Sequence, residues 1–145
     1  MRALVQRVTS ARVEVDEQIV GQIELGLLIL LGCQEGDDQA SAVKMVNRLA
    51  KLRIFEDSAG LTNLDIFAVS GQILLVSQFT LAADLRKGNR PSFTTALAPE
   101  KARILLDFVM QGLIDKGLKV ETGVFGATMQ VHSCNAGPAT YLLEL

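Results

Sequence analysis

Strand-like runs joined by connections of hairpin length are the feature that most limits the folds open to this chain. Near its start, Val13 and Val15 alternate with charged residues, which is the pattern of a half-buried strand. A turn after them leads into residues 18–24, and residues 25–33 form an apolar run with the length of a buried strand. This part of the chain therefore predicts a meander of three or four strands, in which hairpins join antiparallel neighbours.

Two helices are predicted among the strands. The first runs from an N-cap at Asp37-Asp38 to about Lys51, because apolar residues recur at helical spacing between them. The second begins at Pro99, which suits the first helical turn, and Gly117 suits the position after its end. The apolar stripe of this second helix is expected in the core and consists of Ile104, Leu105, Phe108, Val109 and Leu113.

The rest of the chain also favours strands, at residues 52–55, 119–121, 129–133 and 140–145. Strands outnumber helices, and the sequence contains no repeat, low-complexity stretch or linker. We therefore expect a single domain over residues 1–145 of the α+β class. Its sheet should be curved and largely antiparallel, with two main helices.

The composition fits a small domain with an aliphatic core. Hydrophobic residues make up 49% of the chain, yet aromatic residues make up only 5% and tryptophan is absent. No apolar run approaches the roughly 18 residues that a membrane helix needs, and the N-terminus lacks a signal-peptide pattern. Cys33 and Cys134 lie among apolar residues at no metal-ligand spacing, so we interpret both as small core residues in a reducing compartment. The expected location is the cytoplasm, with no membrane partner.

The charge of the chain limits how it can bind nucleic acid. Its formal net charge is −2, whereas a protein that follows a long stretch of nucleic acid is normally basic. Positive residues gather locally at Arg86, Lys87 and Arg90, in a loop that contains glycine and proline. Two interpretations of this loop fit: a solvated surface, or a small contact with phosphates at the end of an RNA.

The pair Gly137-Pro138, between two strand-like runs near the C-terminus, is a rigid backbone element. Proline fixes its own φ and lacks an N–H, and glycine accepts the unusual φ that remains. The pair fits an ordinary trans turn before the last strand. It also fits a cis bond, which would hold two successive carbonyls in a similar direction as a stiff pair of acceptors.

A polar pair ends the apolar run of residues 72–76. Ser77 and Gln78 place a hydroxyl and an amide at the end of a buried strand. In one interpretation they satisfy loose backbone groups there. In the other they are available to a ligand or to another backbone.

Taken together, residues 77–81 (SQFTL) and residues 135–140 (NAGPAT) resemble the two signatures of the D-aminoacyl-tRNA deacylase family, SQxxL and NxGPxT. Further segments also resemble sequences of this family and occur in the expected order, at residues 3–8, 26–32, 52–57, 86–93 and 121–123. The resemblance covers essentially the whole chain.

This resemblance implies a homodimer of pseudo-barrel subunits that hydrolyses the ester bond of D-aminoacyl-tRNA, in chiral proofreading of translation. It implies neither a cofactor nor a metal. Ser77, Gln78 and Phe79 would line the pocket for the acceptor end of the tRNA, with its aminoacyl-adenosine, and Met129 would form part of the wall.

The resemblance also implies a role for residues near the C-terminus, where Asn135, Gly137 and Pro138 would bind substrate. In the family the Gly-Pro pair is cis and is inserted into the pocket of the partner subunit. Its rigid carbonyls would bind the α-amine that all D-amino acids share and leave no room for an L side chain. Arg7, in the apolar first strand, would hold the pair in place; the alternative is an arginine that snorkels from a strand edge.

The candidate catalytic residues are Ser77, Gln78 and Thr140, but the sequence supplies no obvious general base. His132 is the only histidine, and the alternation around it predicts an exposed side chain. A threonine without an adjacent base is a weak nucleophile, and no second histidine supports a Ser-His-Asp scheme. The resemblance implies a substrate-assisted reaction instead, in which the 2′-hydroxyl of the terminal adenosine positions or activates the water.

Two other functions compete with this one. The first is a non-catalytic nucleic-acid-binding dimer on the same fold, with a basic loop and no competent site. The second is an esterase for small substrates. Both signatures are intact, which argues against the non-catalytic alternative.

Overall fold

A long first strand organises the sheet. The structure, a computed structural model, describes residues 1–86 and 88–145. Strand β1 (Arg2–Val15) pairs antiparallel with β2 (Gln18–Ile23) through its second half and with β3 (Gly26–Gly32) through its first half. The chain from β2 to β3 thus runs back along one edge of β1, as the predicted meander requires.

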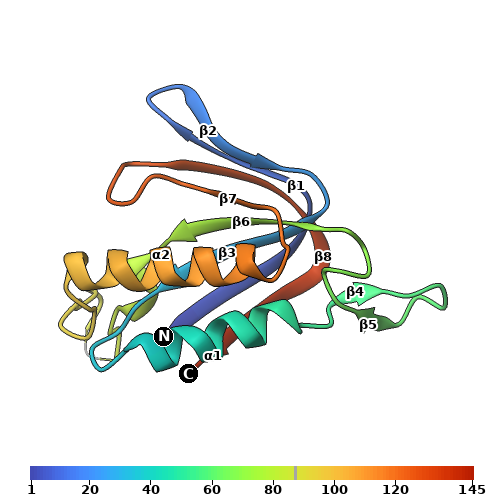
Figure 1. Cartoon of the computed structure of the whole chain (residues 1–145). Coiled ribbons are helices and arrows are strands. Elements are labelled where there is room, and N and C mark those ends of the chain that lie inside the picture. The colour runs from blue at the N-terminus through green and yellow to red at the C-terminus, as the bar shows by residue number, and fades with distance from the viewer. Residues whose placement is uncertain (87) are drawn as a thin grey trace.

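The other edge of β1 is occupied by the last strand, β8 (Gln130–Glu144), which is antiparallel to it. Residues 129–145 were predicted as two strands, but they form one, which is bulged where it passes Arg7. The first and last strands of the chain therefore lie side by side (Figure 1).

The rest of the sheet is parallel, so the prediction of a largely antiparallel sheet is wrong in this part. Strand β6 (Gln72–Ser77) is parallel to β3, and β7 (Val120–Thr122) is parallel to β6. The reason lies in the connections, because helix α1 (Gln39–Ala50) lies between β3 and β6, and helix α2 (Pro99–Asp115) lies between β6 and β7. A helical crossover returns the chain in its original direction and so produces parallel neighbours.

The sheet curls until it nearly closes, which agrees with the pseudo-barrel that the family resemblance implies. Strand β2 bends over toward β7, and a Cβ built on Gly21 would lie 2.4 Å from the carbonyl oxygen of Thr122. Only glycine permits this approach of two backbones. Inside the curl lies a small aliphatic cluster of buried residues: Val8, Ala11, Val13, Ile23, Leu28, Leu74 and Val76.

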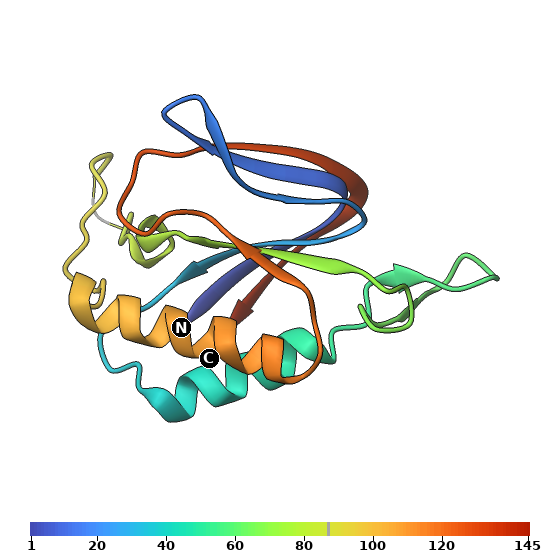
Figure 2. The same cartoon turned by 45° about the horizontal axis from the view of Figure 1, so that its top comes forward.

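Helices α1 and α2 lie next to each other on the opposite face of the sheet (Figures 1 and 2). The predicted N-cap of α1 is confirmed, because the Asp38 carboxylate accepts a hydrogen bond from the Ser41 N–H at 2.8 Å. The predicted apolar stripe of α2 is buried at Leu105, Val109 and Leu113. It is wrong for Ile104, which is 68% exposed because it lies one position away from the buried stripe.

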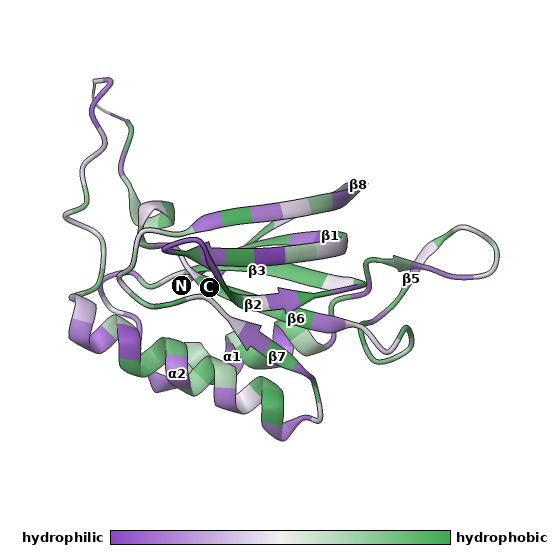
Figure 3. Ribbon diagram, turned by 90° about the horizontal axis from the view of Figure 1, so that it is seen from above, coloured by the Kyte–Doolittle hydropathy of each residue, from purple (hydrophilic) through white to green (hydrophobic). Residues whose placement is uncertain are grey.

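Two segments extend from opposite ends of the molecule (Figure 3). One is the hairpin of β4 (Phe55–Glu56) and β5 (Thr62–Leu64), so the strand predicted at residues 52–55 begins only at its last residue. The other consists of the described residues between the 3₁₀ helix η1 (Phe79–Ala82) and α2. No helix in residues 1–86 or 88–145 is long and apolar enough to cross a membrane.

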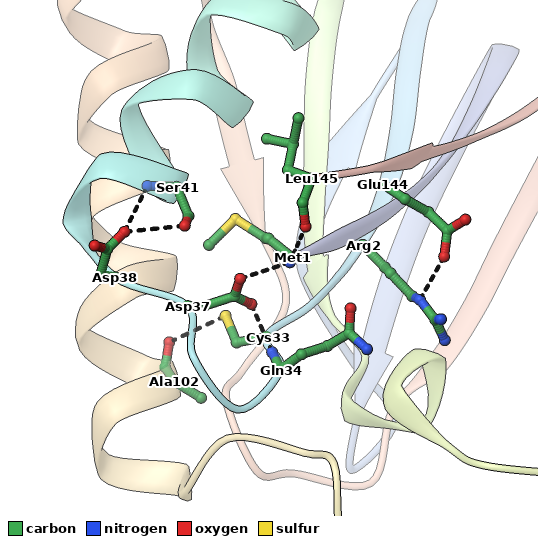
Figure 4. A network of polar contacts seen from close by, with 10 residues as sticks. All are labelled: Met1, Arg2, Cys33, Gln34, Asp37, Asp38, Ser41, Ala102, Glu144 and Leu145. Atoms are coloured by element: carbon green, nitrogen blue, oxygen red, sulfur yellow. Dashed lines mark hydrogen bonds and ion pairs between the residues drawn. The ribbon is translucent and has the colours of Figure 1, made fainter.

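The two ends of the chain meet beside the start of α1 (Figure 4). The ammonium group of Met1 lies 2.6 Å from the Asp37 carboxylate, and it donates to the carbonyl oxygen of Leu145 at 3.1 Å. The second carboxylate oxygen of Asp37 accepts from the Gln34 N–H at 2.6 Å. This network fixes the loop that follows β3.

The contrast between Leu113 and Ile104 gives a stability prediction for α2. Leu113 is fully buried against α1 and the sheet, so Leu113→Ala should lower the free energy of unfolding by about 2–5 kcal/mol. Ile104→Ala should change it by less than about 0.5 kcal/mol, because the side chain is already solvated. Urea unfolding at one fixed protein concentration measures both, and equal losses in the two variants would contradict this account of the core.

Candidate active site

The candidate site begins where β3 and β6 end together. Leu31 of β3 is the register partner of Ser77, and the Gln78 N–H donates to the Leu31 carbonyl at 2.8 Å. The chain then leaves the sheet and turns into η1, which starts at Phe79. The predicted polar strand end is therefore confirmed as a local structure, and it opens onto a cavity.

That cavity has a volume of about 580 Å³ and is mainly apolar. We call it the main pocket. The structure brings together on its lining Ser77, Gln78, Phe79 and Met129, the four residues that the family resemblance assigns to a substrate pocket. The start of α2 and the residue before it also line the pocket, at Ala98, Pro99, Ala102 and Leu106. The remaining lining includes Leu31, Cys33, Phe93, Ala96, Leu97 and the segment before β8.

Two phenylalanines meet at the mouth of the main pocket. The ring centroids of Phe79 and Phe93 lie 5.0 Å apart, with the rings tilted by 56°. Both side chains remain exposed, at 60% and 39%. Sequence reasoning placed Phe79 in the site but missed Phe93, although Phe93 is one of only six phenylalanines in a chain without tryptophan.

Met129 reaches the pocket wall because the residue opposite it, Gly123, has no side chain. A Cβ built on Gly123 would lie 2.5 Å from the Met129 sulfur. Gly123 follows β7, so the glycine at the end of this strand determines where the Met129 side chain packs. The role of the Glu121-Thr122-Gly123 segment could not be read from its sequence alone.

Gly137 and Pro138 do not line the main pocket of their own chain. The peptide bond between them is cis, and both residues are exposed. Residues 136–139 form a bulge of β8 opposite Arg7, because Gln6 pairs with Thr140 and Val8 pairs with Asn135. Arg7 pairs with Leu27, four residues along β3 from Leu31, so the bulge lies about 13 Å along the strands from the Ser77 end.

Arg7 is buried, at 9% exposed, and does not snorkel into solvent. Its Nε donates to the Ala136 carbonyl at 3.0 Å and its Nη1 donates to the Ile54 carbonyl at 2.9 Å. Its Nη2 lies 3.1 Å from a carboxylate oxygen of Glu56. The guanidinium thus connects the bulge of β8 to the root of the β4–β5 hairpin.

Asn135 and Thr140 flank the bulge and likewise lie outside the main pocket of their own chain. Asn135 Nδ2 donates to the Arg7 carbonyl at 3.3 Å, and the Thr140 hydroxyl accepts from Gln6 Nε2 at 3.2 Å. Neither contact involves a general base. Within one chain, Thr140 is therefore separated from Ser77 and Gln78, with which the sequence grouped it.

In the predicted RNA-contacting loop, Arg86 is already paired with Asp84. Arg86 Nε and Nη2 donate to the two carboxylate oxygens at 2.9 and 2.8 Å. The hydrogen bonds from Arg86 hold the pKa of Asp84 well below its ordinary value. Arg90 is exposed, and Lys87 lies outside the described residues.

His132 belongs to a different surface. Its Nε2 lies 3.5 Å from a carboxylate oxygen of Glu14, and its side chain is 42% exposed. It lines a shallow hollow of about 290 Å³ with Ser10, Arg12 and Cys134, away from Ser77. The expected exposure of His132 is only partly borne out, because the side chain is half-buried and its Nε2 is shielded from solvent. The expected burial of Cys134 is wrong, because Cys134 is exposed.

Cys33 is a potential nucleophile on the lining of the main pocket, but its thiol stays protonated. Burial raises the pKa of Cys33 to about 11, and the nearby Asp37 carboxylate adds to the effect. The thiol lies 3.9 Å from the Ala102 carbonyl oxygen, to which it donates. Since the thiolate is the nucleophilic form of cysteine, Cys33 cannot serve as one near neutral pH.

Comparison with known proteins places this chain in one class, the deacylases that act on aminoacyl-tRNA. The family described as D-Tyr-tRNA(Tyr) deacylase matches residues 4–144. A protein of Lactobacillus delbrueckii subsp. bulgaricus named D-aminoacyl-tRNA deacylase is 53% identical, with 100% of both chains covered. A protein of Syntrophotalea carbinolica with the same name is 52% identical, covering 99% of this chain and 97% of the relative. The chain therefore belongs to the D-aminoacyl-tRNA deacylase family.

Two solved structures share the fold. One, titled c-Myc DNA Unwinding Element Binding Protein, has a TM-score of 0.94 at 38% identity and covers 100% of this chain and 99% of its own. The other is titled as a probable eukaryotic D-amino acid tRNA deacylase, with a TM-score of 0.84 at 16% identity over 99% and 98% of the two chains. The second likeness concerns the fold alone.

The protonated state of Cys33 can be tested with a thiol reagent. In a Cys134→Ser variant at pH 8, DTNB should modify the folded protein slowly, because that pH is well below the Cys33 pKa of about 11. Unfolding in urea should release one reactive thiol. The Cys33→Ser variant is the control, since its exposed Cys134 should react at once. Equal rates for folded and unfolded Cys134→Ser would contradict the assignment.

Proposed function

We propose that this chain hydrolyses the ester bond of D-aminoacyl-tRNA and releases a D-amino acid and free tRNA, which removes D-amino acids before translation can use them. The observation that carries the proposal is the main pocket at the end of β6, where Ser77, Gln78 and Phe79 meet Met129. Its volume of about 580 Å³ suits a ligand with both an apolar and a polar part. Membership of the deacylase family supplies the reaction class.

The residues around the pocket support a mechanism without a general base from the protein. His132 does not line the pocket, and the Cys33 thiol is protonated. We assign activation of the attacking water to the 2′-hydroxyl of the terminal adenosine. The N–H groups of Phe79 and Thr80 begin η1 and have no acceptor within that helix, so they are available to the oxyanion that forms on the ester carbonyl.

The second part of the proposal concerns chirality. The carbonyls of Gly137 and Pro138 would bind the α-amine of a D-aminoacyl group and occupy the space that an L side chain needs. Such a site rejects the wrong substrate by steric clash and can accept many D side chains. Arg7 supports this role through its contact with the Ala136 carbonyl beside the pair.

Because the bulge and the main pocket lie apart within one chain, the proposal needs a second copy of the chain. We propose a homodimer in which Gly137-Pro138 of one subunit enters the main pocket of the other. The exposure of both residues supports this arrangement. The outer edge of β8 also supports it, since in the described chain β8 pairs only with β1 and is free to meet a second copy.

The nucleic acid in this proposal is the acceptor end of the tRNA. Arg86, Lys87 and Arg90 are the candidate contacts to its phosphates. A second candidate function is binding of nucleic acid without catalysis, favoured by the 38% identical structure titled as a DNA unwinding element binding protein. A net charge of −2 argues for a short contact in either case. We assign the protein to the cytoplasm.

The decisive experiment incubates the pure protein with matched D-tyrosyl-tRNA and L-tyrosyl-tRNA and measures release of the amino acid. Release from the D form alone is expected. Equal release from both forms would overturn the chiral part of the proposal. Retention of tRNA without release from either form would instead support the second candidate function.

Gly137→Ala tests the contribution of the bulge. A Cβ at residue 137 would lie 2.8 Å from Asn135 Oδ1, so either the Asn135 side chain or the bulge itself must shift. We expect kcat/KM for D-tyrosyl-tRNA to fall by about 10²-fold, because small displacements of positioning groups are costly in catalysis. The urea midpoint should change little, since the residue is exposed.

The control for this variant is Ser133→Ala, an exposed substitution on the same strand, which should leave kcat/KM unchanged. Full activity of Gly137→Ala would remove the bulge from the site.

A further inference from the structure

A second hollow opens directly beside the main pocket. It has a volume of about 170 Å³ and lies between α2 and the ends of β6 and β7. The two hollows share three lining residues, Ser77, Leu106 and Phe125. Ser77 therefore stands at their junction, and a substrate bound at Ser77 in the main pocket can continue into the second hollow.

Helix α2 contributes one charged face to this hollow. Arg103, Leu106, Asp107 and Met110 line it, and their spacing of three, four and seven residues places them on one side of the helix. Leu75, Thr122 and Gly123 complete the lining on the sheet side. Among the described residues that line this hollow, Arg103 is the one cation, and sequence reasoning did not single it out.

The guanidinium of Arg103 is available for a ligand. Arg103 is exposed, and it forms no ion pair with any residue in the described part of the chain. Arg86 differs, because Asp84 already occupies two of its donors. A guanidinium presents a planar fork of donors that matches phosphate oxygens. Asp107 lines the same hollow and weakens its attraction for an anion.

We propose that Arg103 binds the phosphate that joins the terminal adenosine of the tRNA to the nucleotide before it, so that the second hollow is the exit path of the acceptor end. This inference rests on the proposed function, which places that adenosine and its ester in the main pocket, where Ser77 is part of the lining. The phosphate is the first anionic group along the substrate from the ester. Arg103 is a binding residue in this scheme and takes no part in the chemical step.

The test compares two substrates that differ in this phosphate. D-Tyrosyl-tRNA carries it, whereas 3′-O-D-tyrosyl-adenosine does not. For Arg103→Gln, kcat/KM on the tRNA should fall about tenfold, as for loss of a charged hydrogen bond, and kcat/KM on the adenosine ester should stay within about twofold. The slope of log kcat/KM against log salt concentration should become shallower by about 0.7, the value for one phosphate of a single strand.

Two further variants complete the design. Lys101→Gln, two residues earlier on α2 and outside the hollow, removes the same charge and should leave both substrates and the salt slope nearly unchanged. Asp107→Asn should raise kcat/KM on the tRNA by about threefold, because it removes the carboxylate that shares the hollow with the phosphate. A purely structural effect at Arg103 would not separate the two substrates.

The outcomes separate the two proposals. If Arg103→Gln behaves like Lys101→Gln, or lowers activity equally on both substrates, the phosphate contact is wrong while the proposed function stands. If the wild-type protein cleaves the tRNA but not the adenosine ester, the salt slopes of the two variants on the tRNA are compared. A shallower slope for Arg103→Gln than for Lys101→Gln supports the phosphate contact, and equal slopes contradict it. If the wild-type protein cleaves neither, the proposed function fails and the phosphate contact fails with it.

Discussion

The antiparallel pairing of β1 with β8 is the interaction on which the rest of the structure depends. It joins the first fifteen residues of the chain to the last sixteen, and it occupies one whole edge of β1, so that β2 and β3 must share the other edge. The same pairing holds residues 136–139 opposite Arg7, because the register is fixed on both sides of the bulge. A buried guanidinium needs acceptors, and the bulge supplies one of them through the Ala136 carbonyl. Strand pairing and charge burial therefore support the same local geometry.

The main pocket depends on a different part of the sheet. It exists because two helical crossovers make β3, β6 and β7 parallel, so that β3 and β6 end at the same edge. The start of α2 covers that edge, and Gly123 leaves room for Met129 on the other side. Parallel strands commonly form binding sites at their carboxyl ends, and here this arrangement occurs inside a sheet whose other strands are antiparallel.

The sequence predicted local features better than the order of strands. The cap at Asp38, the turn after β1 and the polar strand end at Ser77-Gln78 follow from short-range chemistry, and each is found where the pattern indicated. The parallel strands were missed because the spacing of strand-like runs does not show which strands pair with each other across a helical crossover. Phe93 and Arg103 were missed for a related reason, since their importance comes from neighbours that are distant in the sequence. Gly123 likewise acquires its role only through Met129.

The separation of the two signature segments within one chain links the proposed dimer to the proposed reaction. Ser77 and Gln78 lie where β6 ends, and the bulge with Gly137-Pro138 lies beside Arg7, about 13 Å away along the strands. No side-chain rotation in either segment closes that separation, because both segments are fixed by strand pairing. A site that uses both must take one of them from a second copy of the chain. The described lining of the main pocket carries no imidazole, which is consistent with the proposed reaction, in which the protein contributes position, backbone donors and exclusion of the wrong enantiomer while the substrate supplies the proton acceptor.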